Sequence, residues 1–197
     1  MTERIDEQEL PGLRPPAGSD GDDRSEPSGE HAGGELRVPE GYTTLHGTPD
    51  GRRAVAIVLS KFNAEITNRL LERALGELDK LGVPRDAVMI MPVPGAFELP
   101  LAAMALAKTR RYAAIVALGC VIRGETAHSD YISSEAASGL QLAAIETGVP
   151  ISFGVLTVDT RQQAEERIDR AADAVRSALE MADVFSQLRA QAAGPLR

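Results

Sequence analysis

Four short, continuous runs of apolar residues recur along the chain, at 54–59, 87–93, 113–122 and 151–158. A strand with one face in water alternates apolar and polar positions, whereas a strand covered on both faces gives an unbroken apolar run. The pattern therefore predicts four buried strands of a parallel sheet.

Between these runs, apolar residues recur at helical spacing at 64–82, 97–110, 130–148 and 161–190. Glycines end the first and third of these segments, and neither Gly nor Pro interrupts the fourth. Alternating strands and helices favour right-handed crossovers and a sheet buried between helix layers. The predicted fold class is α/β, a three-layer α/β/α arrangement with a four-stranded parallel sheet.

The composition changes near residue 40. Residues 1–40 are rich in Gly, Pro, Asp, Glu and Ser, and they cannot bury enough apolar surface to offset their ordering entropy. We expect a disordered acidic tail there, with a docking or targeting segment as the alternative. Residues 41–197 are predicted to form a single domain, and residues 36–47 could lie extended on a neighbouring chain.

Charge and cysteine content exclude several function classes. Residues 1–50 hold 12 acidic and 4 basic residues, which accounts for the whole net charge of −8. Residues 51–197 are therefore neutral overall, which argues against the basic face of a nucleic-acid-binding protein. One cysteine excludes a disulfide framework and a multi-cysteine metal site. We expect no membrane span, because no window approaches ~18 apolar residues, and no secretory signal, hence a cytoplasmic protein.

The residues that could carry chemistry follow the predicted strands. In an open parallel sheet, ligands bind beyond the carboxyl ends of the strands. The segments at those ends are 60–63, 92–100, 119–132 and 157–160, and they hold most of the unusual residues of the chain. We therefore predict one shared site for a planar, partly anionic ligand.

Segment 119–132 carries the strongest signals. Glu125 and Thr126 precede a predicted helix, where N–H groups and the helix dipole favour an anion such as phosphate. His128 is the only histidine of the predicted domain's helices and strands, and it suits proton transfer near neutral pH; the alternative is a surface residue that caps the helix. Cys120 is more typical of a small buried hydrophobe than of a nucleophile.

The remaining candidates each have a structural alternative. Phe62 either stacks on a planar ring or plugs the core, and Glu98 either accepts hydrogen bonds from ligand hydroxyls or pairs with a helix N-terminus. Arg167 and Arg170, expected one turn apart on the last helix, either clamp a phosphate or lie on a solvated face.

Five motifs in order, SKFNAEI, PVPGAFELP, GCVIRGETAHSDYI, FGVLTVDT and QAEER, resemble those of the lumazine synthase family over about residues 52–190. The resemblance implies a flavodoxin-like fold. It also implies condensation of 5-amino-6-(D-ribitylamino)uracil with 3,4-dihydroxy-2-butanone 4-phosphate to 6,7-dimethyl-8-ribityllumazine, phosphate and water. The family uses no metal or organic cofactor, and its active sites lie between subunits of a homo-oligomer.

The resemblance also implies roles for individual residues. His128 matches the residue that transfers protons, and Glu125, Thr126 and Arg167 match those that bind the butanone phosphate. The positions that match the pyrimidine and ribityl pocket are Phe62, Ala96, Phe97, Glu98, Cys120, Val121, Ile122 and Phe153. By this match, Phe153 and Arg167 come from a neighbouring subunit.

This sequence also departs from the family pattern. Lys61 stands where Arg is usual, and Ser129 where an aromatic is common. The family often has a Gly/Lys/Asn-rich kink between two terminal helices, and here IDRAADAVRS runs on without a helix breaker, which favours fusion of those helices. Because that kink accompanies sixty-subunit shells, we expect a pentamer, or two pentamers paired into a decamer. The rival interpretations are a non-catalytic flavin- or lumazine-binding or scaffold paralogue, and a cargo shell that uses the tail.

Overall fold

A computed structural model describes residues 37–193 of the chain. Its four strands are β1 (Val55–Ser60), β2 (Val88–Val93), β3 (Ala114–Ile122) and β4 (Ile151–Val158). They form one sheet in the order β2-β1-β3-β4, and all neighbours pair in parallel. The four predicted strands are thus confirmed, whereas most of the predicted tail lies outside the described residues.

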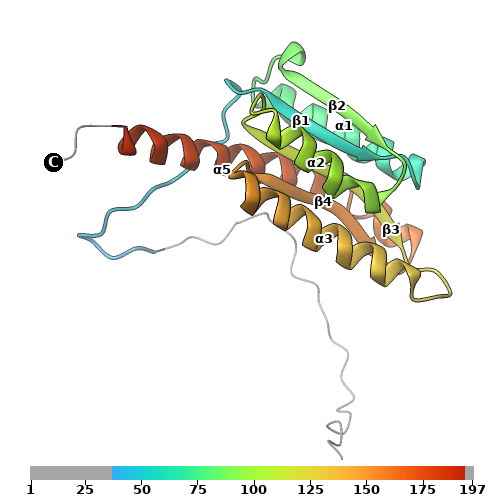
Figure 1. The fold of residues 1–197 in the computed structure, drawn as a ribbon. Coiled ribbons are helices and arrows are strands. Elements are labelled where there is room, and N and C mark those ends of the chain that lie inside the picture. The colour runs from blue at the N-terminus through green and yellow to red at the C-terminus, as the bar shows by residue number, and fades with distance from the viewer. Residues whose placement is uncertain (1–36, 194–197) are drawn as a thin grey trace, which may run out of the picture. The chain divides into compact units, whose positions relative to one another are not determined.

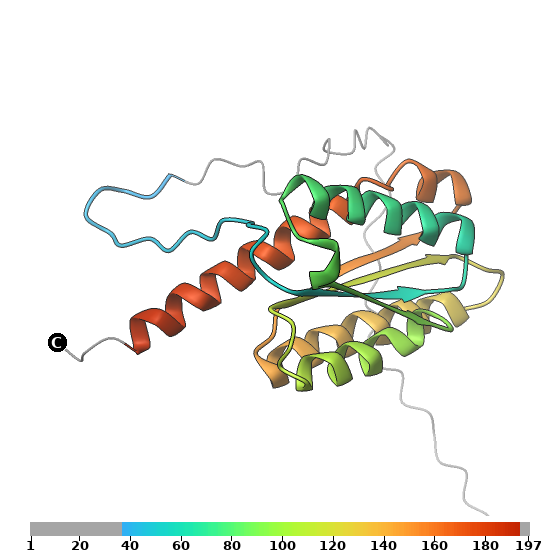
Figure 2. The ribbon, with the colours of Figure 1, turned by 90° about the horizontal axis from the view of Figure 1, so that it is seen from above.

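Two layers of helices enclose the sheet (Figures 1 and 2). The helices α1 (Ala64–Lys80) and α5 (Arg170–Ala192) cover one face, and α2 (Leu99–Lys108) and α3 (His128–Thr147) cover the other. A short helix, α4 (Arg161–Glu165), and two 3₁₀ turns, η1 (Arg85–Ala87) and η2 (Ala96–Glu98), complete the described elements. This is the predicted three-layer α/β/α arrangement.

The sheet divides the core into two apolar clusters, one under each helix layer. All six residues of β1 and eight of the nine residues of β3 are buried, as expected for central strands. In contrast, Val93 is the only buried residue of β2. β2 stands at the edge of the sheet, and the described chain does not cover both of its faces although its sequence is apolar.

The end of the chain differs from the sequence prediction. The prediction of one uninterrupted helix over 161–190 is wrong at its start. The chain turns at residues 166–169 and only then enters α5. In this turn the N–H groups of Arg167 and Arg170 donate to carbonyls three residues earlier, at 3.1 and 3.0 Å. Ile168 packs against the apolar cluster beneath α1 and α5, so tertiary packing replaces a Gly or Pro as the cause of the break. Beyond Arg170 the helix is continuous, without the kink common in the family.

Candidate active site

A cavity of about 460 Å³ opens at the carboxyl ends of β1, β2 and β3. Phe62 and Asn63 follow β1, Gly95–Glu98 follow β2, and Cys120–Ile122 close β3. The start of α3 supplies the remaining wall. The residues that line the cavity are Phe62, Asn63, Gly95, Ala96, Phe97, Glu98, Cys120, Val121, Ile122, Gly124, Thr126, His128, Ser129 and Ile132.

The wall after β1 is fixed by backbone geometry. Asn63 adopts a left-handed conformation (φ 57°), which Asn tolerates better than most residues, and this turns the chain into α1. Its Nδ2 donates to the carbonyl of Cys120 at 2.9 Å, which ties the end of β1 to the end of β3. The side chain of Phe62 is 71% exposed, so this ring is not a core plug in the chain described here.

The wall after β2 is a tight turn closed by Glu98. The backbone N–H of Gly95 donates to Oε2 of Glu98 at 2.8 Å. The carboxylate thus pairs with the start of a helical turn, which was one of the two alternatives predicted for Glu98. Phe97 is 55% exposed, whereas Ala96 is buried.

The floor of the cavity includes the single cysteine. Cys120 is free and only 2% exposed. Burial raises the pKa of its thiol to about 11, so the thiol stays protonated at neutral pH. This environment agrees with a small buried hydrophobe and disfavours a nucleophile.

The wall contributed by α3 brings the imidazole and the anion-binding groups together. His128 is the first residue of α3 and is exposed, and its backbone N–H lies 3.5 Å from Oγ1 of Thr126. Arg123 holds the base of the loop, since its N–H donates to the carbonyl of Val158 at 2.8 Å and its Nε lies 2.7 Å from Asp159. The positive end of a 20-residue helix therefore faces the cavity beside Thr126.

Three predicted residues do not line this cavity. Glu125 is exposed in the loop between Gly124 and Thr126, and Phe153 lies on the edge strand β4, 46% exposed. Arg167 lies in the turn before α5 and not on the last helix as expected. The residues that line the cavity include no Lys or Arg. A cation for a phosphate group would therefore have to come from outside this lining.

Other cavity residues were not singled out from the sequence as site residues: Asn63, Gly95, Gly124, Ser129 and Ile132. An Asn in the short loop after a buried strand, as at Asn63 three residues beyond β1, is a usable signal for a left-handed residue at a ligand-binding edge. Ile132 gave no such signal, because an apolar residue one helical turn after His128 reads as ordinary core packing. The Oγ atom of Ser129 is buried, and no described residue bonds it.

Two further features bear on what this site can hold. Within residues 37–193, no group of three or more His, Cys, Asp and Glu side chains is arranged to hold a metal ion. Among the helices described, none is both long and apolar enough to cross a membrane.

The chain matches known proteins over this whole region. The family model described as 6,7-dimethyl-8-ribityllumazine synthase matches residues 52–186. Proteins named 6,7-dimethyl-8-ribityllumazine synthase from Yersinia pestis (strain Pestoides F) and Yersinia pseudotuberculosis serotype O:1b (strain IP 31758) are each 45% identical over 160 residues. The alignment covers 78% of this chain and 99% of each relative. With the parallel sheet and the strand-end cavity, these matches show that the chain belongs to the 6,7-dimethyl-8-ribityllumazine synthase family.

Proposed function

We propose that this chain condenses 5-amino-6-(D-ribitylamino)uracil with 3,4-dihydroxy-2-butanone 4-phosphate to give 6,7-dimethyl-8-ribityllumazine, phosphate and water, and that His128 transfers the protons. One observation carries the proposal beyond the family match. Phe62, Glu98, Thr126 and His128 come from three separate chain segments and line one cavity of about 460 Å³. A non-catalytic relative would be expected to lose His128 or the phosphate loop.

The pyrimidine binds between the ends of β1 and β3 in this proposal. The exposed ring of Phe62 offers a face for stacking on the planar heterocycle. The ribityl chain lies along residues 95–98, where Glu98 uses Oε2 to bond Gly95 and keeps Oε1 as an acceptor for a hydroxyl. Cys120, Val121 and Ile122 supply an apolar floor.

The butanone phosphate binds at the start of α3. Thr126 offers a hydroxyl, Gly124 and Glu125 offer backbone N–H groups, and the dipole of α3 favours the negative charge. This places the ketone of one substrate beside the amine of the other and converts a bimolecular reaction into one between held groups.

The reaction then needs repeated proton transfer. The 5-amino group adds to the ketone, and loss of water gives an imine. Removal of a carbon-bound proton expels phosphate, the enol becomes a second carbonyl, and the ribityl-bearing amine closes the ring with loss of another water. His128, which lines the cavity together with Thr126, can accept and return these protons.

A neighbouring copy completes the site in this proposal. The lining lacks Lys and Arg, and Phe153 and Arg167 lie outside it. In a ring of identical subunits, β4 and the turn before α5 of one copy would face the cavity of the next, so that Arg167 could pair with the phosphate. The proposed assembly is a pentamer, alone or paired into a decamer, acting in the cytoplasm; a single cysteine with no partner in the chain suits that compartment.

The direct test mixes both substrates with the purified chain and follows the absorbance and fluorescence of the lumazine. We expect turnover without an added metal or cofactor. Substrate binding without any product, in enzyme of native assembly, would instead support the non-catalytic paralogue.

A further inference from the structure

The turn at residues 166–169 is held from the side by α1. Nε of Arg73 on α1 lies 2.5 Å from Oδ1 of Asp169, the residue directly before α5. Ile168, next to it, packs into the core, and Arg167 comes one residue earlier. The turn contains no Gly or Pro. These side-chain anchors therefore act together with the backbone hydrogen bonds of the turn.

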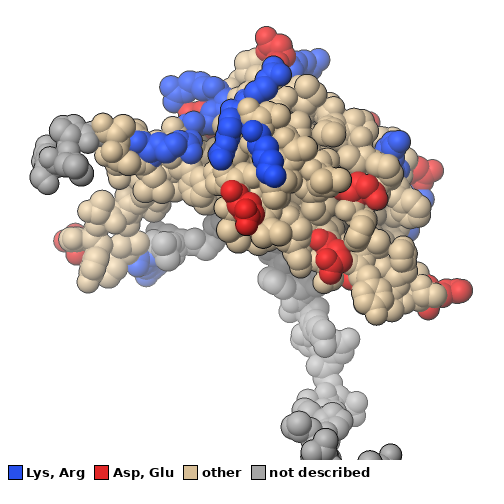
Figure 3. All heavy atoms as spheres, in the orientation of Figure 1, with Lys and Arg blue, Asp and Glu red and all other residues tan. Residues whose placement is uncertain are grey.

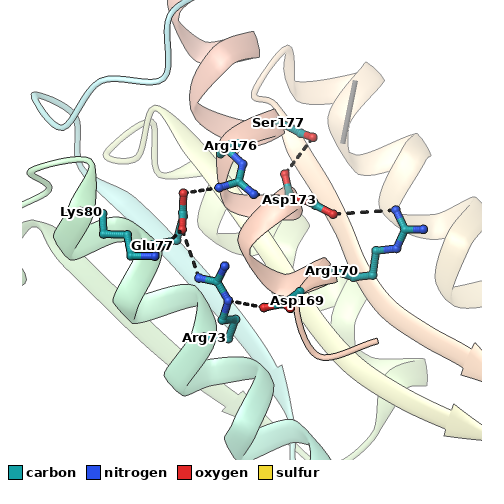
Figure 4. A network of polar contacts seen from close by, with 8 residues as sticks. All are labelled: Arg73, Glu77, Lys80, Asp169, Arg170, Asp173, Arg176 and Ser177. Carbon is teal, nitrogen blue, oxygen red and sulfur yellow. Dashed lines mark hydrogen bonds and ion pairs between the residues drawn. The ribbon is translucent and has the colours of Figure 1, made fainter. Parts of the chain in front are cut away.

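Arg73 is itself fixed by a buried carboxylate. Its Nη1 donates to Oε2 of Glu77 at 3.1 Å, one helical turn further along α1. The side chain of Glu77 is only 6% exposed and also accepts a hydrogen bond from Arg176 on α5. Figure 4 shows Glu77 between these two guanidinium groups, with dashed lines from Arg73 to both Glu77 and Asp169.

The same cluster continues along α5. Nη2 of Arg176 donates to Oδ1 of Asp173 at 3.0 Å, and Nη1 of Arg170 lies 3.8 Å from Oδ2 of Asp173. Arg73 thus bridges two carboxylates: Glu77, which also contacts Arg176 and Lys80, and Asp169, whose side chain is 85% exposed. Its guanidinium group ties α1 to the residue directly before α5.

We propose that Arg73, supported by Glu77, is a positioning residue: through Asp169 it fixes the turn that carries Arg167 and so sets the affinity for the butanone phosphate. This inference rests on the proposed function. Arg73 touches neither substrate and acts only through Arg167. The helix α1, which directly follows Asn63 of one subunit's pyrimidine pocket, thus also holds in place the cation that the same subunit presents to its neighbour.

The position of Arg167 agrees with this role. Its Nη1 donates to the carbonyl of Gln163 at 3.0 Å and lies 3.7 Å from the carboxylate of Glu166. In addition, the packing of Ile168 in the core and the bond from Arg73 to Asp169 tie the turn to parts of the chain that are distant in sequence.

The test measures the Michaelis constants of both substrates for Asp169→Asn and Arg73→Met. We expect each variant to raise the constant for the butanone phosphate about 2- to 5-fold, the range that loss of a partly exposed ion pair gives, and to leave that for the pyrimidine unchanged. Arg73→Lys keeps the charge but not the fork and should fall between wild type and Arg73→Met. Asp79→Asn, also on α1, is the matched control, because it breaks an exposed pair with Arg85 of η1 and should change neither constant.

Arg167→Ala provides the reference pattern, a large rise for the butanone phosphate alone. If it shows this pattern while Asp169→Asn and Arg73→Met only lower the melting temperature, the pair is merely structural and the proposal is overturned. If wild type makes no lumazine, the proposed function fails on its own. Calorimetry with inorganic phosphate then decides the positioning role: weaker binding by Asp169→Asn supports it, and equal binding rejects it.

Discussion

At the scale of single residues, the environment of each titratable side chain decides whether it can transfer protons to a substrate. The titratable side chains in the cavity lining are Glu98, Cys120 and His128. Glu98 is engaged with Gly95, and burial keeps the Cys120 thiol protonated because its pKa is about 11. The exposed imidazole of His128 at the start of α3 is thus the group of the lining best placed to exchange protons with a bound substrate.

We predict that His128→Ala lowers kcat by roughly 10- to 10⁴-fold, the range expected for loss of one general acid–base group. Binding of the ribityl pyrimidine, followed by fluorescence titration, should be retained, because Phe62 and the floor of the cavity are untouched. His46→Ala is the matched control, since this histidine lies in the segment before β1 and its backbone carbonyl, not its ring, bonds Gln187. An unchanged kcat in His128→Ala would remove His128 from the mechanism.

At the scale of elements, polar and steric contacts decide how the helices meet. Glu77 joins α1 to α5 on one face of the sheet, where Arg73 and Arg176 converge on its carboxylate. Burial raises the pKa of Glu77, but the hydrogen bonds and charges of its partners outweigh that effect and hold the pKa below 4.5. This carboxylate therefore stabilises the fold in its ionised form.

The pH dependence of stability follows from that sign. Above pH 4.5 the contribution of Glu77 is fully present, and it is lost as the pH falls through the lowered pKa, because the unfolded chain then binds the proton first. We predict that Glu77→Gln lowers the free energy of unfolding by about 1–3 kcal/mol at pH 7 and by less at pH 3 to 4. Urea unfolding at fixed protein concentration measures both, and an equal loss at every pH would contradict the prediction.

The other helix pair meets at a glycine. A Cβ at Gly139 on α3 would lie 2.7 Å from Cβ of Pro100 on α2, whereas a Cβ at Gly76 on α1 would meet nothing within 4 Å. We predict that Gly139→Ala destabilises the protein by about 1–3 kcal/mol through overpacking. Gly76→Ala, the matched helical control, should stabilise it by about 0.5–1 kcal/mol. Thermal or urea unfolding of both variants checks the pair, and a stabilised Gly139→Ala would show that α2 and α3 can separate at low cost.

At the scale of the whole molecule, the described chain exposes apolar side chains that a monomer would be expected to cover. Leu101 on α2 and Tyr131 and Ile145 on α3 are 75%, 70% and 69% exposed. Figure 3 shows that the face over α2 and α3 is mostly uncharged, with scattered acidic side chains. A second cavity, of about 340 Å³, lies between the end of α3, the start of β4 and α5. Surfaces of this kind are typical of contacts between subunits.

We predict a mass near 100 or 200 kDa, about five or ten times the 20.9 kDa chain, by light scattering of the purified protein. These masses correspond to one closed ring of five subunits or to two such rings. The continuous α5 lacks the kink that accompanies shells in the family, which favours the ring. Acidic tails crowded on a shell would also repel one another at low salt. A particle of megadalton mass would contradict the ring, and electron microscopy would show its form.

The four strands can be predicted from the sequence, because a central parallel strand must be apolar on both faces. The runs at 54–59 and 113–122 therefore predicted β1 and β3 to within one residue at each end. Nine of the twelve site residues chosen from the sequence line one cavity for a related reason: the parallel topology alone brings the carboxyl ends of the strands together.

Only the tertiary structure decided where the chain turns before α5. Residues 166–169 are all compatible with a helix, and the break follows from Ile168 entering the core and Asp169 meeting Arg73, residues separated by 96 positions. It also decided that Phe62 stands in the cavity and that Glu77 is buried between two arginines. Local patterns record which face of an element is apolar, whereas a turn or an ion pair between distant segments depends on how the packed elements meet.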